Sequence, residues 1–322
     1  MEIDLKSLPK FAKEYLYYLE TIKGRSVTTV HGYENDLRMF FRFLKHHKIP
    51  EFANTELAKI PISDIGVDFI AEVSLADIYE FLHFVSSGRN NSAVTRSRKV
   101  SSIKGLYKYL TVKAGLFKEN PAKELEVPAA KKRLPVYLTL EQSLELLTKT
   151  NSSSPLRDYC ILTLFLNCGM RLSELVSINL SSIRENRLRI VGKGNKEREI
   201  HLNTACIKSI ENYVANEREK LNKIVDKSAL FLGKTTGRRL SARMVQIIVQ
   251  KALENAELSE MGFSPHKLRH TAATLMYQHG NVDIRILKEI LGHVNLGTTE
   301  IYTHISDKNV KDAINKNPLA NV

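Results

Sequence analysis

Apolar residues recur at helical spacing along most of this chain, and the period changes to that of strands in one stretch only. Residues 10–22 and 28–46 carry large apolar side chains three and four positions apart, which is the spacing of one face of an α-helix. Residues 187–191 and 197–202 instead alternate around Gly192-Lys193-Gly194-Asn195, a pattern typical of a β-hairpin with a glycine-rich tip. The sequence therefore predicts a mostly α fold with a small β-hairpin or sheet.

Capping signals place the starts of further helices. The segment Ser74–Asp77 has the form of a capping box without its usual Glu or Gln, and Thr139–Gln142 has the complete form. Ser154-Pro155 supplies an N-cap and a proline at the first helical position, and Gly169 fits the C-cap of the helix that follows. Arg171 is therefore expected at a helix boundary.

The length of 322 residues predicts about two domains. In residues 126–137, two prolines that oppose helix continuation bracket the basic triplet Lys131-Lys132-Arg133. We interpret this segment as a linker between an N-terminal helical domain, residues 1–125, and a C-terminal domain, residues 138–322. The stretch from Pro50 to Val73 contains several apolar residues and is expected to be ordered.

The net charge of +13 would attract polyanions, although charge alone equally fits a soluble basic protein. Between Gly88 and Lys118 there are eight basic residues and no acidic one. Residues 92–114 keep their apolar side chains on one stripe, so we expect an amphipathic helix with a basic outer face that contacts DNA. The alternative is a solvated surface helix. The candidate DNA contacts are Arg96, Arg98, Lys99 and Lys104 of this helix and Lys131, Lys132 and Arg133 of the linker.

Several classes of protein are disfavoured by the sequence. There is no apolar run long enough to span a membrane, and the N-terminus lacks the apolar region of a signal peptide. The three cysteines, Cys160, Cys168 and Cys206, have no metal-binding spacing and are expected to be core thiols in a reducing compartment. We therefore expect a cytoplasmic protein with no metal site and no nucleotide cofactor.

Side chains suited to phosphodiester chemistry gather near the C-terminus: His266 and Arg269 in S-P-H-K-L-R-H-T, His293 in L-G-H and Tyr302 in E-I-Y-T-H-I. Arginine can clamp a phosphate, histidine can move a proton near neutral pH, and tyrosine can attack phosphorus and form a covalent intermediate. Each motif alone is weak. His293 could be a helix C-terminal cap, and most of the 12 tyrosines must be packing residues.

The order of the motifs carries more information than any one of them. Cys168-Gly-Met-Arg-Leu-Ser-Glu-Leu175, then Val191-Gly-Lys-Gly-Asn-Lys-Glu-Arg198, then the three later motifs resemble the tyrosine recombinase (phage integrase) family, and Xer-type site-specific recombinases in particular. The resemblance is strong over residues 135–307. It is weaker over residues 10–125, where the family has a helical, SAM-like core-binding domain.

The resemblance implies a catalytic role for each matching residue. Arg171 and Arg269 would hold the scissile phosphate, and Lys193 would protonate the leaving 5′-oxygen. His266 would assist proton transfer or bond the phosphate, and His293 would bond a non-bridging oxygen. Tyr302 would be the nucleophile. Glu174 would support Arg171, although the pair could equally be a simple helix cap. Lys196 is an alternative to Lys193, and His270 is expected to point elsewhere.

The implied protein is a site-specific recombinase of duplex DNA that acts through a 3′-phosphotyrosyl intermediate and a Holliday junction. It would resolve chromosome dimers at cell division or integrate and excise a mobile element. The implied assembly is a homo-tetramer, or a hetero-tetramer with a second recombinase, on paired sites, with a DNA translocase as a candidate activator. Residues 307–317 would dock on a neighbouring protomer. The rivals are a type IB topoisomerase, a DNA-binding regulator without activity and a metal-dependent nuclease.

Overall fold

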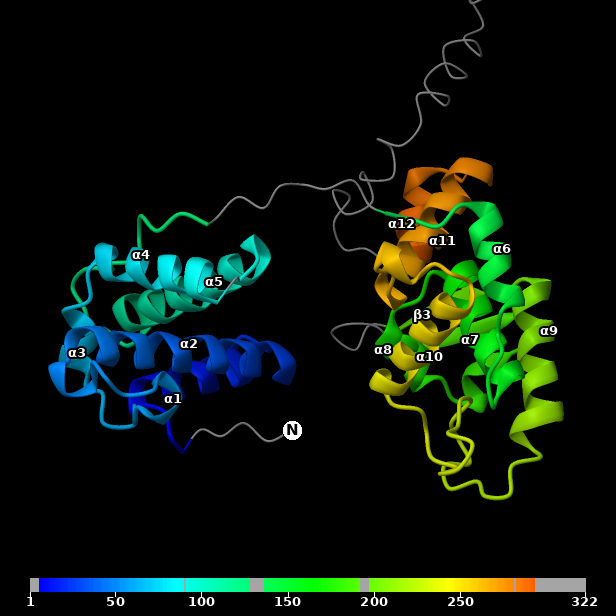
Figure 1. Ribbon diagram of the computed structural model, residues 1–322, viewed down its shortest axis with the longest axis horizontal. Coiled ribbons are helices and arrows are strands. Elements are labelled where there is room, and N and C mark those ends of the chain that lie inside the picture. The colour runs from blue at the N-terminus through cyan, green and yellow to red at the C-terminus, as the bar shows by residue number, and fades with distance from the viewer. Residues whose placement is uncertain (1–5, 90, 128–135, 192–196, 281, 293–322) are drawn as a thin grey trace, which may run out of the picture. The chain divides into compact units, whose positions relative to one another are not determined.

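The computed structural model describes residues 6–89, 91–127, 136–191, 197–280 and 282–292 (Figure 1). The chain divides into two compact units, residues 1–132 and 133–322, and each has an apolar core of its own. The predicted mostly helical fold is confirmed, with one small antiparallel sheet in the second unit. No described helix is both long and apolar enough to cross a membrane.

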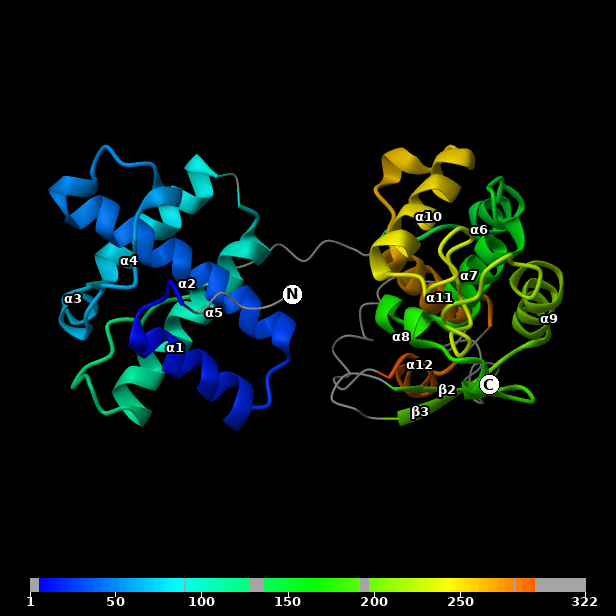
Figure 2. The same ribbon diagram turned by 90° about the horizontal axis from the view of Figure 1, so that it is seen from below.

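The first unit is built from helices (Figures 1 and 2). Aromatic side chains such as Phe40, Phe41 and Phe81 are buried in its core. In chain order the helices are α1 (Lys10–Tyr17), α2 (Val27–Lys48), α3 (Val67–Ala71), α4 (Leu75–His83) and α5 (Ala93–Lys108). Single π-helical turns extend α1, α4 and α5 to Ile22, Gly88 and Lys113. The helices predicted from residues 10–22, 28–46 and 92–114 are thus confirmed.

Local signals account for where these helices begin. The Ser74 hydroxyl accepts a hydrogen bond from the Asp77 amide, and the Asp77 carboxylate accepts one from the Ser74 amide. Aspartate therefore completes the capping box at α4 without Glu or Gln. The stretch from Pro50 to Val73 is ordered as expected, because Ile62 and Ile65 are buried in the core of this unit.

A buried ion pair joins α2 to α5. The Asp36 carboxylate accepts hydrogen bonds from Lys99 Nζ at 2.9 Å and from Arg98 Nη1 at 2.6 Å. Asp36 and Lys99 are only 1% and 3% exposed, so the expectation that Lys99 lies on a basic outer face is wrong. Burial raises the pKa of Asp36, and the two cations oppose that rise.

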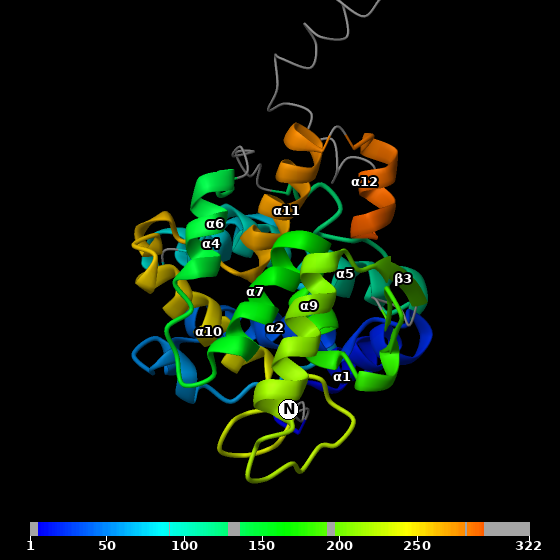
Figure 3. The ribbon, with the colours of Figure 1, turned by 90° about the vertical axis from the view of Figure 1, so that its right-hand side faces the viewer.

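The second unit wraps its helices around one buried helix, α7 (Figure 3). Its helices are α6 (Leu140–Thr148), α7 (Pro155–Cys168), α8 (Leu172–Ser177), α9 (Thr204–Tyr213), α10 (Ala242–Asn255), α11 (Pro265–His279) and α12 (Ile284–Leu291). Proline begins α7 and glycine ends it, as predicted, but the Ser154 hydroxyl caps nothing and is buried without a hydrogen-bond partner among the described residues. The three cysteines are buried thiols, as expected, and burial raises the pKa of Cys160 to about 12.

The sheet has the order β1-β2-β3, from β1 (Ile183–Arg184), β2 (Arg187–Val191) and β3 (Glu197–His201). The predicted hairpin is confirmed as β2 and β3, and the short β1 was not predicted. Leu188 pairs with Ile200, and Ile190 pairs with Arg198. Since opposite residues of an antiparallel pair share a face, Arg198 points to the same face as the buried Leu188 and Ile200.

Candidate active site

Arg171 is placed by the end of one helix and the start of the next. Gly169 ends α7 in the left-handed conformation, with φ of 56°, and Arg171 is the N-cap of α8. The boundary predicted for Arg171 is thus confirmed. Its guanidinium donates two hydrogen bonds, from Nη1 to Glu174 Oε1 at 2.7 Å and from Nη2 to the Gly292 carbonyl at 3.0 Å.

Glu174 is the common acceptor of two arginines. The Arg171 amide donates to Glu174 Oε2 at 2.7 Å, and Arg198 donates from Nη1 to Oε1 at 2.9 Å and from Nη2 to Oε2 at 3.2 Å. Burial alone would raise the pKa of Glu174. The Arg171 amide, the charge of Arg198 and the charge of Arg171 hold that pKa below its usual value. Glu174 is therefore an anion that supports the arginines and not a proton donor at neutral pH.

Arg269 lies inside the protein on α11 and is 3% exposed. Its Nη1 donates to the Gly169 carbonyl at 2.8 Å and its Nη2 donates to the Leu291 carbonyl at 2.6 Å. Arg171 and Arg269 thus bond to successive carbonyls at the C-terminal end of α12, where the helix dipole is negative. The two arginines that the sequence assigned to the phosphate are brought together here.

His266 and His270 form a pair on α11, next to the two arginines. Their Nε2 atoms are 3.1 Å apart and their ring planes meet at 80°. The expectation that His270 points elsewhere is wrong, because positions four apart share a helix face. Burial and the charges of Arg269 and Arg171 lower the pKa of His266. Burial, then the neighbouring His266 and Arg269, lowers the pKa of His270 to about 4.

Three of the predicted catalytic residues, Lys193, His293 and Tyr302, lie outside the described residues, as do Lys131, Lys132 and Arg133 and the segment 307–317. In the sequence, Lys193 falls between the ends of β2 and β3, and His293 directly follows Gly292. Their roles remain predictions.

Arg198 is the site residue to which the sequence reasoning gave no role. It closes the G-K-G-N-K-x-R motif, and strand alternation places it on the side of Ile200. That alternation could have identified it as an inward-facing arginine. Within the described ranges no group of three or more His, Cys, Asp or Glu residues is arranged to hold a metal ion.

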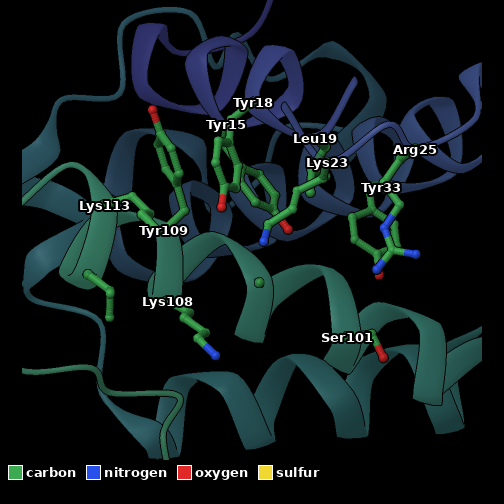
Figure 4. A pocket seen from close by; sticks show the side chains of 12 residues that line it. Tyr15, Tyr18, Leu19, Lys23, Arg25, Tyr33, Ser101, Lys108, Tyr109 and Lys113 are labelled. Atoms are coloured by element: carbon green, nitrogen blue, oxygen red, sulfur yellow. The ribbon is translucent and has the colours of Figure 1, made fainter. Parts of the chain in front are cut away.

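The first unit has a separate hollow between α1 and α5, with a volume of about 530 Å³. Figure 4 shows tyrosine side chains from both helical segments lining it beside basic ones. The aromatic and basic lining residues are Tyr15, Tyr18, Tyr33, Tyr109, Lys23, Arg25, Lys108 and Lys113. The lining residues that the structure describes include no acidic side chain, so the hollow favours an anion.

The other predicted DNA contacts on α5 have partners inside the protein. Arg96 Nη1 donates to the Ser86 hydroxyl at 3.0 Å, and Lys104 Nζ donates to the Leu125 carbonyl at 2.7 Å. Arg98 and Lys99 share Asp36, as described above. These contacts give each residue a structural task, and DNA binding by Arg96, Arg98, Lys99 and Lys104 stays a prediction.

The two units and the arginine-glutamate site define the class of protein. Residues 136–309 match the phage integrase family, and residues 12–61 match the N-terminal SAM-like domain of phage integrases. The chain belongs to the phage integrase family.

Particular relatives agree with this assignment. The chain is 48% identical over 312 residues to the tyrosine recombinase XerC of Caldanaerobacter subterraneus subsp. tengcongensis, covering 97% of this chain and 88% of that protein. The fold is similar to XerH site-specific recombinase bound to palindromic difH substrate in a post-cleavage complex, with a TM-score of 0.68, 21% identity and 98% of each chain covered. It is also similar to a lambda integrase tetramer bound to a Holliday junction, with a TM-score of 0.64, 17% identity and coverage of 88% and 76%.

Proposed function

We propose that this protein is a site-specific DNA recombinase that cleaves and rejoins duplex DNA through Tyr302. The observation that carries the proposal is the meeting of Arg171 and Arg269 at the end of α12, directly before His293 in the chain. Family membership and the 48% identity to a tyrosine recombinase over nearly the whole chain support the same reaction.

The reaction follows from phosphoryl-transfer chemistry. The phenolic oxygen of Tyr302 attacks phosphorus, and the bond between phosphorus and the 5′-oxygen breaks. Lys193 gives a proton to that oxygen, so the products are a 3′-phosphotyrosyl link and a free 5′-hydroxyl. The 5′-hydroxyl of a partner duplex then attacks the link and releases Tyr302. Each step exchanges one phosphoester for another, so no nucleotide cofactor is needed.

The described residues supply binding and proton transfer. Arg171 is partly exposed and keeps donors beyond the two that hold Glu174 and Gly292, so it can bond a non-bridging oxygen. The lowered pKa of His266 leaves its imidazole neutral at pH 7, and a neutral imidazole can accept the proton of the tyrosine. Arg269 adds positive charge and ties the ends of α7 and α12 together.

Residues 1–125 would form the core-binding domain, 126–137 the linker and 138–322 the catalytic domain. The hollow lined by tyrosines and lysines in the first unit supports DNA binding by that unit. The proposed assembly is a homo-tetramer, or a hetero-tetramer with a second recombinase, on two duplex recombination sites in the cytoplasm, at the nucleoid. A translocase would activate it if its task is chromosome dimer resolution, and integration or excision of a mobile element is the other task.

A nicked suicide duplex carrying a candidate recombination site tests the proposal. We expect an SDS-resistant protein–DNA adduct without added metal, and we expect Tyr302→Phe to abolish it. Tyr159→Phe, on the surface of α7, is the matched control and should form the adduct normally. An adduct that persists in Tyr302→Phe would refute the assigned nucleophile. Relaxation of supercoiled DNA without exchange between two sites would indicate a topoisomerase instead.

A further inference from the structure

Arg198 is a third guanidinium in the site, and the chemistry above gives it no task. It reaches in from β3 and donates through both terminal nitrogens to the two oxygens of Glu174, at 2.9 and 3.2 Å. This two-bond geometry fixes the plane of the carboxylate as well as its position. Arg189, on the neighbouring strand, also pairs with a glutamate, Glu197, but both of those side chains are exposed.

The charges of this group show what Arg198 contributes. Glu174 is 2% exposed and carries one negative charge, which it shares between Arg171 and Arg198. With both arginines the three side chains carry a net charge of +1. If Arg198 were absent, Glu174 would neutralise Arg171, and this group would no longer add its positive charge to that of Arg269 where the phosphate binds.

The position of Arg198 also depends on the end of α12. A Cβ atom at Gly292 would lie 2.5 Å from Arg198 Nη1 and 3.0 Å from its Cζ, so the guanidinium lies directly against this glycine. The carbonyl of the same glycine accepts the hydrogen bond from Arg171 Nη2. Arg198 Nε is buried and has no hydrogen-bond partner in the part of the chain that the structure describes. An unpaired buried donor is costly, and the two hydrogen bonds from Arg198 to Glu174 have to offset that cost.

We propose that Arg198 is a positioning residue for strand cleavage, an inference that rests on the proposed recombinase function. It neutralises and orients Glu174, and it thereby leaves the positive charge of Arg171 to bind the scissile phosphate. Arg198 acts through Glu174 and need not touch the DNA. The role predicts a specific coupling, in which removing the negative charge of Glu174 compensates for the absence of Arg198.

The experiment measures single-turnover cleavage of the nicked duplex, and DNA affinity, for the full-length wild type, Arg198→Met, Arg198→Lys, Glu174→Gln and the double variant Arg198→Met/Glu174→Gln. Arg198→Met should slow cleavage by about ten- to a hundredfold. This is the range found when a group that orients a metal ligand is removed, and Arg198 orients Glu174 in the same indirect way. DNA affinity should stay within about twofold, because most of the affinity comes from contacts along the DNA backbone. Arg198→Lys keeps the charge and should be impaired less.

The double variant distinguishes this role from a structural one. We expect Arg198→Met/Glu174→Gln to cleave faster than Arg198→Met, because the neutral glutamine no longer cancels the charge of Arg171. Arg189→Met is the matched control on the same hairpin and should cleave like the wild type, since it removes only an exposed ion pair. If Arg198→Met does not fold, as judged by circular dichroism, cleavage by Arg198→Lys and by the double variant tests the inference instead. We expect both of these variants to cleave the DNA.

Two results would overturn the inference while leaving the recombinase function intact. One is wild-type cleavage by Arg198→Met. The other is a double variant that is as slow as Arg198→Met or slower, or inactive where Arg198→Met does not fold. If the wild type forms no adduct at all, the proposed function falls, and the role of Arg198 falls with it.

Discussion

Replacing Lys99 with methionine tests whether this lysine stabilises the fold, as its contacts indicate, or serves DNA. The change removes the ammonium that lies 2.9 Å from Asp36 Oδ1 and keeps a side chain of similar length. Breaking a buried ion pair by removing one partner typically costs about 3–5 kcal/mol. Arg98 remains on Asp36 but is 43% exposed, so it compensates only in part. We expect a decrease of about 2–4 kcal/mol in the free energy of unfolding.

Urea unfolding of the full-length protein, followed by far-ultraviolet circular dichroism, measures this decrease. Because the chain has two units that can unfold in separate transitions, hydrogen exchange of peptides from α2 and α5 assigns the decrease to the first unit. Lys59→Met is the matched control, since Lys59 also pairs with a carboxylate, that of Glu56, but is 76% exposed. Its effect should stay within about 0.5 kcal/mol.

A double variant separates the effect of the ion pair from that of the side chain. In Asp36→Leu/Lys99→Met the buried carboxylate is gone as well, and replacing a whole buried pair by apolar residues is often neutral. We expect this variant to be more stable than Lys99→Met alone. The reasoning is refuted if Lys99→Met unfolds like the wild type. If its DNA affinity also falls, Lys99 is a DNA contact, as the sequence suggested.

Three further predictions follow from single contacts. Gly169→Ala should cost about 1–3 kcal/mol in urea unfolding, because φ is +56° and the new Cβ would lie 2.8 Å from Leu291 Cδ2; wild-type stability would contradict this. The pKa of His270 is about 4 in the folded protein and near 6.5 in the unfolded chain. The contribution of His270 to stability is therefore complete above pH 6.5 and is lost as the pH falls towards 4. Over that range, the urea midpoint of His270→Gln should fall less than the urea midpoint of the wild type. The double variant Lys23→Gln/Lys108→Gln should weaken DNA binding and make it less dependent on salt. The slope of the logarithm of the binding constant against the logarithm of the salt concentration should decrease by about 1 for each DNA phosphate that is no longer neutralised. An unchanged slope would exclude these lysines from the DNA interface.

Features set by neighbouring residues could be predicted from the sequence. The capping pair of Ser74 and Asp77, and the glycine at 169 that ends α7, act within a single turn of helix. The strand period around residues 187–201 likewise reports which side chains face inward. Ser154 shows the limit of such signals, because its residue type and place suit an N-cap but its hydroxyl accepts no capping hydrogen bond.

Contacts between distant segments could not be read in the same way. No residue close to Lys99 in the sequence indicates that this lysine will be buried and paired with Asp36 on another helix. Arg171 and Arg269 donate hydrogen bonds to backbone carbonyls. Every residue has such a carbonyl, so the type of residue does not indicate which carbonyl will accept the bond. His270 differs, because its spacing from His266 was sufficient to place both on one face of the helix.

The use of backbone carbonyls has a consequence for how the site is assembled. Leu291 and Gly292 hold Arg269 and Arg171, so the register of α12 sets the position of both guanidiniums at once. α12 itself packs through Leu287 and Leu291 on Ala273 of α11, in a small apolar cluster separate from the main core of this unit. A cluster of that size contributes less stability than the core around α7, so we expect α12 to open more easily than α7. The two phosphate arginines therefore depend on the docking of one short helix, and a weakened contact at Leu287 would disturb both without changing either.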